Sequence, residues 1–166
     1  MKTLTTLFVG ITLACTSGCM FNKPKKPVVK NPIIVPLTEQ EKAVVKQEVF
    51  AKLDEWMKGF NALDIPTWQG TMHFPTYRLA NGKMYIHKKP PKATPEGIQN
   101  YLGEEWDHSA WIKRDIVQYG RDKVHVATTF ARFRKDNSEI ARYQSLYILR
   151  KIDGKWGVTF RSSFAR

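Results

Sequence analysis

The sequence is poor in cysteine: its 166 residues include only two, Cys15 and Cys19, and both lie near the start. The chain beyond Cys19 therefore cannot hold a disulfide framework, a cysteine nucleophile or a cysteine-ligated zinc or iron–sulfur centre. Its four histidines are spread singly, without the His-x-His or His-Glu-x-x-His spacing of a metal site. Phosphate-binding glycine loops and the Gly-x-Ser-x-Gly elbow are also missing. We expect no metal ion and no cofactor.

The first eighteen residues predict export from the cytoplasm. Lys2 supplies a positive start, and residues 4–14 form an apolar stretch interrupted only by threonines and one glycine. This stretch is too short for a membrane-spanning helix, which needs about 20 apolar residues, and it has the layout of a secretory signal. We therefore expect residues 1–18 to be a signal peptide that is removed.

Residues 16–19, Thr-Ser-Gly-Cys, resemble the lipobox of bacterial lipoproteins, in which small residues precede a cysteine that becomes acylated. The resemblance implies that lipidated Cys19 anchors the mature chain to membrane lipid, because several buried acyl chains give stable attachment. Cys15 is a second candidate, although bulky Leu13 stands where a small residue is preferred. An ordinary secreted protein with a stray cysteine is the other interpretation.

The residues after Cys19 predict a location and a tether. Bacterial lipoproteins without Asp directly after the lipidated cysteine are usually sent to the outer membrane, and Met20 stands there. The resemblance thus implies the cell envelope, with the domain facing the periplasm. Residues 20–37 contain four prolines, four lysines and no acidic residue. We expect residues 19–37 to be an extended spacer whose lysines lie near anionic headgroups.

The positive charge of the chain is unevenly distributed. Of its 27 basic residues, five lie before residue 38, which leaves 22 against 15 acidic residues in the remainder. Such an excess can indicate nucleic-acid binding. The expected compartment and the lack of a recognised nucleic-acid motif argue against that partner. A solvated basic surface or an anionic ligand explains the charge instead.

Three helices are predicted beyond the tether. Thr38-Glu39-Gln40-Glu41 forms a capping box, after which apolar residues recur every three or four positions as one stripe of a long helix. That stripe comprises Val45, Val49, Leu53, Trp56, Phe60 and Leu63. Asp64 is placed to cap a second, short helix with Pro66 in its first turn. Thr94-Pro95 opens a third helix, whose expected inner face consists of Ile98, Tyr101, Leu102 and Trp106.

Alternating patterns predict the strands. Residues 74–79 and 84–87 flank Asn81-Gly82, the preferred pair for a tight hairpin turn. Four further strands, joined by connections so short that neighbours must be antiparallel, are expected at residues 111–119, 123–135, 139–152 and 155–164. In the last strand Trp156, Val158 and Phe160 are expected to face the long helix. Both faces of the preceding strand are apolar enough to predict a homodimer through one sheet face.

This order of elements resembles the nuclear transport factor 2-like superfamily, also called SnoaL-like or cystatin-like α+β cones. The motifs that carry the resemblance are His73-Phe74-Pro75, Trp106-Asp107-His108-Ser109, Gly-Lys-Trp-Gly-Val at residues 154–158 and Ser-Ser-Phe at residues 162–164. The resemblance covers residues 38–166. It implies an α+β domain in which a curved antiparallel or mixed sheet wraps a long N-terminal helix, with two shorter helices.

The resemblance also implies a pocket at the open end of the cone. Its expected lining comprises His73, Tyr77, Trp106, His108, Trp111 and Arg132. One hypothesis is a binding module for a small apolar or anionic ligand, or for a partner protein, supported by aromatic and arginine residues that include Arg134 and Arg161. The alternative is an acid–base isomerase, dehydratase or cyclase that uses His73, Asp107 and His108. Plain structural roles for these three residues, in a turn and at a helix end, are favoured over catalysis.

The lipidation hypothesis predicts a direct labelling result. Cells that produce the wild-type chain should incorporate radioactive palmitate into it, and cells that produce Cys19→Ala should not, because the acyl acceptor is gone. Labelling is measured by autoradiography of the immunoprecipitated protein. Equal labelling of the two chains would contradict Cys19 as the anchor.

Overall fold

The structure is a computed structural model that describes residues 36–165. The expected signal peptide, Cys19 and all of the tether before residue 36 lie outside the described residues, and these assignments stay predictions. The folded part begins with helix α1 (Glu39–Asn61), capped as predicted. Thr38 Oγ1 accepts a hydrogen bond from the Glu41 backbone N–H at 3.2 Å, and the Glu41 carboxylate accepts one from the Thr38 N–H at 2.8 Å.

Two shorter helices follow the long one. Helix α2 (Ile65–Gly70) begins at Asp64, and helix α3 (Pro95–Leu102) begins at Thr94, both as predicted. The placement of Trp106 on the inner face of the third helix is wrong. The helix ends at Leu102 because Gly103 adopts a φ of 95°, which residues with side chains rarely adopt, and Trp106 lies in the loop beyond.

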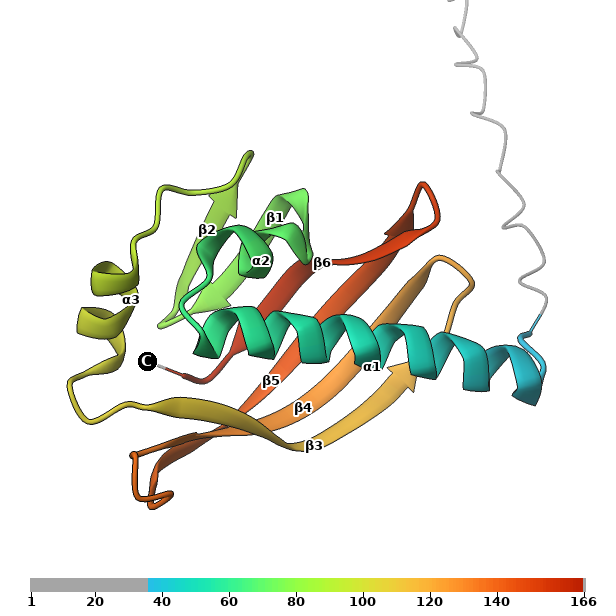
Figure 1. Cartoon of the computed structure of the whole chain (residues 1–166). Helices are drawn as coiled ribbons and strands as arrows, with labels where there is room; N and C mark the ends of the chain where they lie inside the picture. Colours follow the sequence, from blue (N-terminus) through green and yellow to red (C-terminus); the bar gives the residue numbers. More distant parts are fainter. Residues whose placement is uncertain (1–35, 166) are drawn as a thin grey trace, which may run out of the picture. The chain divides into compact units, whose positions relative to one another are not determined.

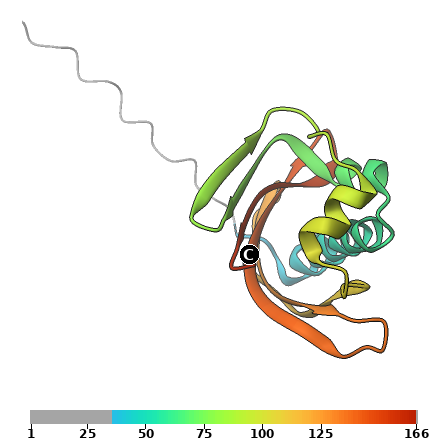
Figure 2. The same ribbon diagram turned by 90° about the vertical axis from the view of Figure 1, so that its left-hand side faces the viewer.

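Six strands form one mixed sheet in the order β2-β1-β6-β5-β4-β3. Their bounds are Met72–Ala80 (β1), Lys83–His87 (β2), His108–Gln118 (β3), Lys123–Phe133 (β4), Glu139–Ile152 (β5) and Lys155–Ser163 (β6). Strands β1 and β6 are parallel, and all other neighbours are antiparallel. The sheet curves around α1 (Figures 1 and 2). These features confirm the expected α+β cone.

The core lies between α1 and the concave face of the sheet. Val49, Leu53 and Trp56 of the helix meet Tyr147 and Leu149 of β5, and all five are buried. Trp156 and Val158 of β6 belong to the same cluster, as their alternation predicted. No helix among residues 36–165 is long and apolar enough to cross a membrane.

The expectation that Phe160 shares the face of Trp156 and Val158 is wrong, because β6 contains a bulge. Val158 pairs with Leu149, yet Phe160 pairs with the adjacent Ile148, so Thr159 is an extra residue. An extra residue turns every following side chain to the opposite face. Phe160 therefore joins Ile148 on the outer face, and Arg161, opposite Tyr147, points to the concave side. The homodimer through the outer face stays a prediction.

Glu48 of α1 ties the helix to the sheet. Its Oε2 accepts hydrogen bonds from Lys151 Nζ and from Trp156 Nε1, both at 2.7 Å. The Lys151 bond, then the Trp156 bond, lowers the pKa of Glu48 from its ordinary value of 4.5. A carboxyl whose pKa is lower in the folded chain stabilises the fold above its unfolded pKa, and this stabilisation disappears as the pH falls through the folded pKa.

We predict that Glu48→Gln lowers the free energy of unfolding at neutral pH by about 1 kcal/mol, because Lys151 and Trp156 lose a charged acceptor. The variant should also lose less stability than wild type as the pH falls below about 4.5. Urea denaturation across that pH range measures both effects. Glu55→Gln, on the same helix but paired only with nearby Lys52, is the matched control. Parallel pH profiles for wild type and Glu48→Gln would contradict the prediction.

Candidate functional site: an arginine-lined cavity

A cavity of about 440 Å³ opens between α1, α3 and the concave face of the sheet. Every helix and five of the six strands contribute to its walls, as does the loop at residues 92–94. This volume lies within the range that small-molecule sites in proteins commonly have. The cavity is therefore large enough for a small organic ligand.

One side of the cavity is aromatic and aliphatic. Trp56 contacts three other aromatic residues of the lining, with ring centroids 5.1 Å from Phe60, 6.0 Å from Trp68 and 5.9 Å from Tyr147. Ile98 and Leu102 of α3 complete the apolar wall, as the predicted inner face of that helix suggests. The cavity can thus bury the apolar body of a ligand, and the aromatic rings can stack on a planar one.

The cavity also carries positive charge, which comes from three arginines on three different strands. Arg78 of β1 and Arg161 of β6 are direct neighbours in the parallel pair, and Arg132 lies on β4. Arg161 also lies 5.7 Å over the ring of Trp56, and Arg132 lies 5.0 Å over the ring of Tyr143. Arg78 Nη2 donates a hydrogen bond to the Tyr101 hydroxyl at 3.0 Å. The guanidinium groups are thus held by aromatic partners.

These arginines have no acidic partner among residues 36–165, in which nine other ion pairs form. Burial lowers the pKa of Arg132, and the positive charges of Arg161 and Arg78 act in the same direction. An arginine stays protonated at physiological pH even so. The cavity therefore concentrates positive charge that an anion would neutralise.

A second, smaller cavity of about 90 Å³ adjoins the first, and the two share Trp56, Trp68, Arg78 and Arg161 as walls. Two donors in this shared wall, Trp68 Nε1 and Arg78 Nε, are buried and have no hydrogen-bond partner among the described residues. Leaving a buried donor unpaired is costly. Both donors could be satisfied by an acceptor oxygen of a ligand bound at the wall.

His73 takes no part in the larger cavity. Its Nε2 lies 2.9 Å from the carbonyl oxygen of Lys155, the first residue of β6, and its ring packs on Gly157. His108 lies on β3, at the other end of the sheet order from β1. The structure therefore does not bring His73 and His108 together.

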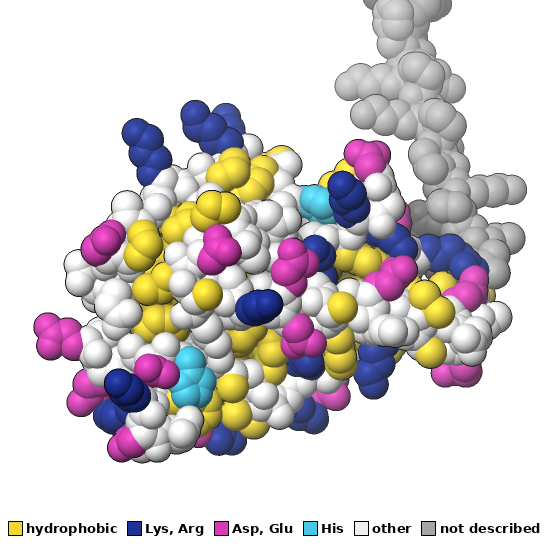
Figure 3. Space-filling view, viewed as in Figure 1, with side chains coloured by type: hydrophobic (Ala, Val, Ile, Leu, Met, Phe, Trp, Pro, Cys, Tyr) yellow, Lys and Arg dark blue, Asp and Glu magenta, His cyan; other side chains and the backbone are white. Residues whose placement is uncertain are grey.

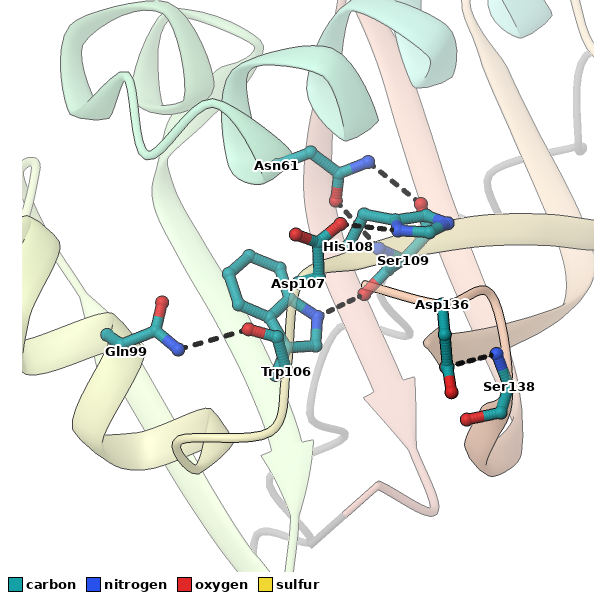
Figure 4. Close-up of polar contacts among 8 residues, drawn as sticks. All are labelled: Asn61, Gln99, Trp106, Asp107, His108, Ser109, Asp136 and Ser138. Carbon is teal, nitrogen blue, oxygen red and sulfur yellow. Dashed lines mark hydrogen bonds and ion pairs between the residues drawn. The ribbon is translucent and has the colours of Figure 1, made fainter. Parts of the chain in front are cut away.

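Asp107 and His108 belong to a polar cluster at the start of β3 (Figure 4). His108 Nδ1 lies 2.9 Å from the Asp107 carboxylate, and the His108 ring stacks on Phe133 with centroids 5.2 Å apart. Trp106 Nε1 donates to Ser109 Oγ at 3.0 Å, and the Asn61 side chain bonds both backbone groups of Ser109. These contacts fasten the loop before β3 to the end of α1.

The remaining predicted residues lie in different places. Arg132 lines the larger cavity, and Tyr77 lines the smaller one. Trp111 packs against the core, with its Nε1 donating to the Leu53 carbonyl at 3.3 Å. Arg134 pairs with Glu105 at the surface. Within residues 36–165, no three His, Cys, Asp or Glu side chains gather as metal ligands do.

Sequence reasoning missed Arg78 and placed Arg161 only loosely. Arg78 is the one charged residue in the otherwise apolar stretch at residues 77–80, and this isolated charge could have singled it out. The position of Arg161 inside the cone depends on the bulge at Thr159, and a simple alternation assigns it to the outer face. Trp68 joins the cavity because α2 packs on α1, with Trp68 and Phe60 ring centroids 5.6 Å apart.

A family model described as "NTF2-like protein (DUF6841)" matches residues 46–162. The chain belongs to this NTF2-like family. The match extends from the second turn of α1 to the end of β6 and so includes most of the cavity-lining residues. No curated protein matches the chain in sequence.

Solved structures share the fold of this NTF2-like chain. A Nostoc punctiforme protein of unknown function with a cystatin-like fold has a TM-score of 0.63 at 15% identity, over 80% of this chain and 96% of that one. A ketosteroid isomerase-like protein from Erwinia carotovora atroseptica has a TM-score of 0.52 at 23% identity, over 76% and 97%. Hexachlorocyclohexane dehydrochlorinase LinA-type3 from Novosphingobium barchaimii has a TM-score of 0.54 at 12% identity, over 76% and 89%.

The packing of His73 on Gly157 gives a test of its structural role. A Cβ at Gly157 would lie 2.6 Å from His73 Cδ2, so Gly157→Ala must displace the ring from Lys155. We expect a loss of about 1–3 kcal/mol in the free energy of unfolding. In a His73→Ala background the same substitution should cost less, because the obstructing ring is absent.

Urea denaturation of the two single variants and the double variant measures this coupling. Gly70→Ala is the control, since a Cβ there meets nothing within 4 Å. If Gly157→Ala lowers the free energy of unfolding equally with and without the His73 ring, that ring is not the reason why position 157 requires glycine.

Proposed function

We propose that this domain binds a small amphipathic anion in the larger cavity, with an apolar body and one carboxylate, sulfate or phosphate group. The observation that carries the proposal is the set of three arginines that face an aromatic cavity without an acidic partner. A guanidinium presents planar donors that match such oxyanions, and it is the residue type most suited to binding them away from bulk water.

The apolar wall and the positively charged wall of the cavity would hold different parts of the ligand. Its apolar body would lie against Trp56, Phe60 and Leu102. Its anionic group would lie at the neighbouring Arg78 and Arg161, where the unpaired Nε of Arg78 offers a further donor. An oxyanion there would supply the acceptor that this buried N–H lacks, which favours an acid over a neutral molecule.

Acid–base catalysis is the alternative, since two of the structural neighbours carry enzyme names. A general acid or base must lie within hydrogen-bond reach of the reacting atoms. None of the described residues that line the larger cavity is Asp, Glu or His. His73 contacts the backbone carbonyl of Lys155 in β6, and His108 pairs with Asp107 beside Phe133. Binding explains the cavity better than proton transfer by these residues.

The site of action follows from the N-terminal sequence. We propose that acylated Cys19 holds the domain at the cell envelope, on the periplasmic side of the outer membrane. The tether would keep the domain close to the bilayer, where amphipathic acids concentrate. A lipid-anchored carrier or sensor of such acids fits both the anchor and the cavity.

Three ten-carbon probes with different head groups test the binding proposal. Decanoate should bind the full chain at least tenfold more tightly than decanol, and decyltrimethylammonium should bind most weakly, because the arginines repel a cation. Trp56 and Trp68 line the cavity, so quenching of tryptophan fluorescence reports occupancy. Isothermal titration calorimetry measures the affinities independently.

Variants locate the binding to the cavity. Arg161→Gln and Arg132→Gln should each weaken decanoate binding by roughly ten- to a hundredfold, the range for a lost hydrogen bond to a charged group. Arg134→Gln removes an arginine that pairs with Glu105 outside the cavity and should leave the affinity unchanged. Equal affinity for decanoate and decanol, or equal effects of all three substitutions, would contradict the proposal.

A further inference from the structure

The segment from α2 to the start of α3 carries charge of one sign. No Asp or Glu lies between Asp64 and Glu96, whereas one arginine and four lysines do. The lysines are exposed and form no ion pair among the described residues: Lys83, Lys88, Lys89 and Lys92. In Figure 3, Lys and Arg side chains stand out at the top, above the end of β2 and the loop that follows it.

The same segment exposes aliphatic side chains. Leu79 of β1 and Met84 of β2 are cross-strand partners, and Ile86 lies two residues further along β2. Their exposed fractions are 37%, 53% and 58%. Strand β2 is an edge of the sheet, and Figure 2 shows the tip of the β1–β2 hairpin pointing away from α1. We call Leu79, Met84, Ile86, Lys88 and Lys89 the hairpin surface; Lys83 projects from the opposite face of β2.

We propose that the hairpin surface docks on a bilayer that contains anionic lipid. Aliphatic side chains can enter the interfacial region, while adjacent lysines meet the lipid phosphates. Strand β2 has an unpaired backbone edge, which cannot be buried in hydrocarbon without a large cost. The hairpin therefore rests at the depth of the headgroups, where water still satisfies that edge.

The side chains of the hairpin surface favour lipid over a protein partner. Protein–protein interfaces are enriched in arginine and aromatic residues and depleted in lysine. The hairpin surface has the opposite basic residue, two lysines, beside leucine, methionine and isoleucine. Tyr77, opposite Ile86 and 36% exposed, is a residue type that is also enriched at membrane interfaces. A lysine is a compact point charge that suits mobile lipid phosphates, whereas arginine suits fixed bidentate partners.

Protection against aggregation is the other explanation for these lysines, because edge strands often carry lysine, which prevents pairing with another chain. That role requires the lysines alone and gives Met84 and Ile86 no contact with lipid. Docking requires the aliphatic side chains to enter the interface. A probe at one of these positions therefore separates the two explanations.

The experiment uses the full chain with Cys15→Ser and Cys19→Ser, and an environment-sensitive nitrobenzoxadiazole label on a single new cysteine. Ile86→Cys reports the hairpin surface, and Val117→Cys on the opposite edge strand β3 is the matched control. The native side chains at these positions are 58% and 56% exposed. On vesicles of phosphatidylglycerol and phosphatidylethanolamine, the label at position 86 should shift to shorter wavelength, and a doxyl-lipid quencher should reduce its emission.

The label at position 117 should not change, and phosphatidylcholine vesicles should leave both labels unchanged. Lys88→Gln with Lys89→Gln should weaken the vesicle response at position 86 by roughly thirtyfold, or about fivefold per lysine. The exposed pair Lys58→Gln with Lys123→Gln serves as the charge-matched control and should have little effect. Because position 86 lies outside both cavities, these results do not depend on ligand binding.

An unshifted label at position 86 would overturn the proposal and leave an acidic protein surface as the partner to test. Equal shifts at positions 86 and 117 would overturn it as well, because the chain would then approach the vesicle without a preferred face. A shift at position 86 that survives both lysine substitutions would remove the electrostatic part of the proposal.

Discussion

The packing of Trp56 between the long helix and the curved sheet is the contact on which the rest of the domain depends. Its indole belongs to the buried core that joins α1 to β5 and β6, and it also lines both cavities. Stacking on Phe60 and edge contacts with Trp68 and Tyr147 hold it in place. The cavity wall is thus an extension of the core, so the close packing of the core also holds the residues of that wall in place.

The extra residue in β6, Thr159, brings a third arginine, Arg161, into the cavity. Without the bulge at Thr159, Phe160 would face the long helix and Arg161 would face away from the cavity, which would leave Arg78 and Arg132 as its arginines. With it, a guanidinium lies over an indole ring beside Arg78, the neighbouring residue on β1. Cation–π contact compensates part of the cost of burying that charge, but it supplies no counter-charge. The positive charge of Arg161 that an anion could neutralise therefore lies in the cavity because of the bulge in β6.

Much of the fold could be predicted because its signals are local. The capping box at Thr38, the Asp64 and Thr94 helix starts and the Asn81-Gly82 turn each depend on residues within four positions. The site was harder to predict. Arg132 was expected in the cavity, whereas the bulge that orients Arg161 and the parallel pairing that brings Arg78 beside it depend on contacts distant in sequence. His73 and His108 were the predicted catalytic candidates, yet a backbone carbonyl and a carboxylate, respectively, are their partners.

The parallel pairing of β1 with β6 also constrains how the domain assembles. Among the described residues, strand β6 is the last strand, and it joins the β1–β2 hairpin to the antiparallel block of β3, β4 and β5. Until β6 is in place, the hairpin has no neighbour in the sheet and Arg161 is missing from the cavity. Closure across such a long separation is slow compared with local pairing. A chain that folds from its N-terminus as it emerges would therefore complete the cavity only after β6 has emerged.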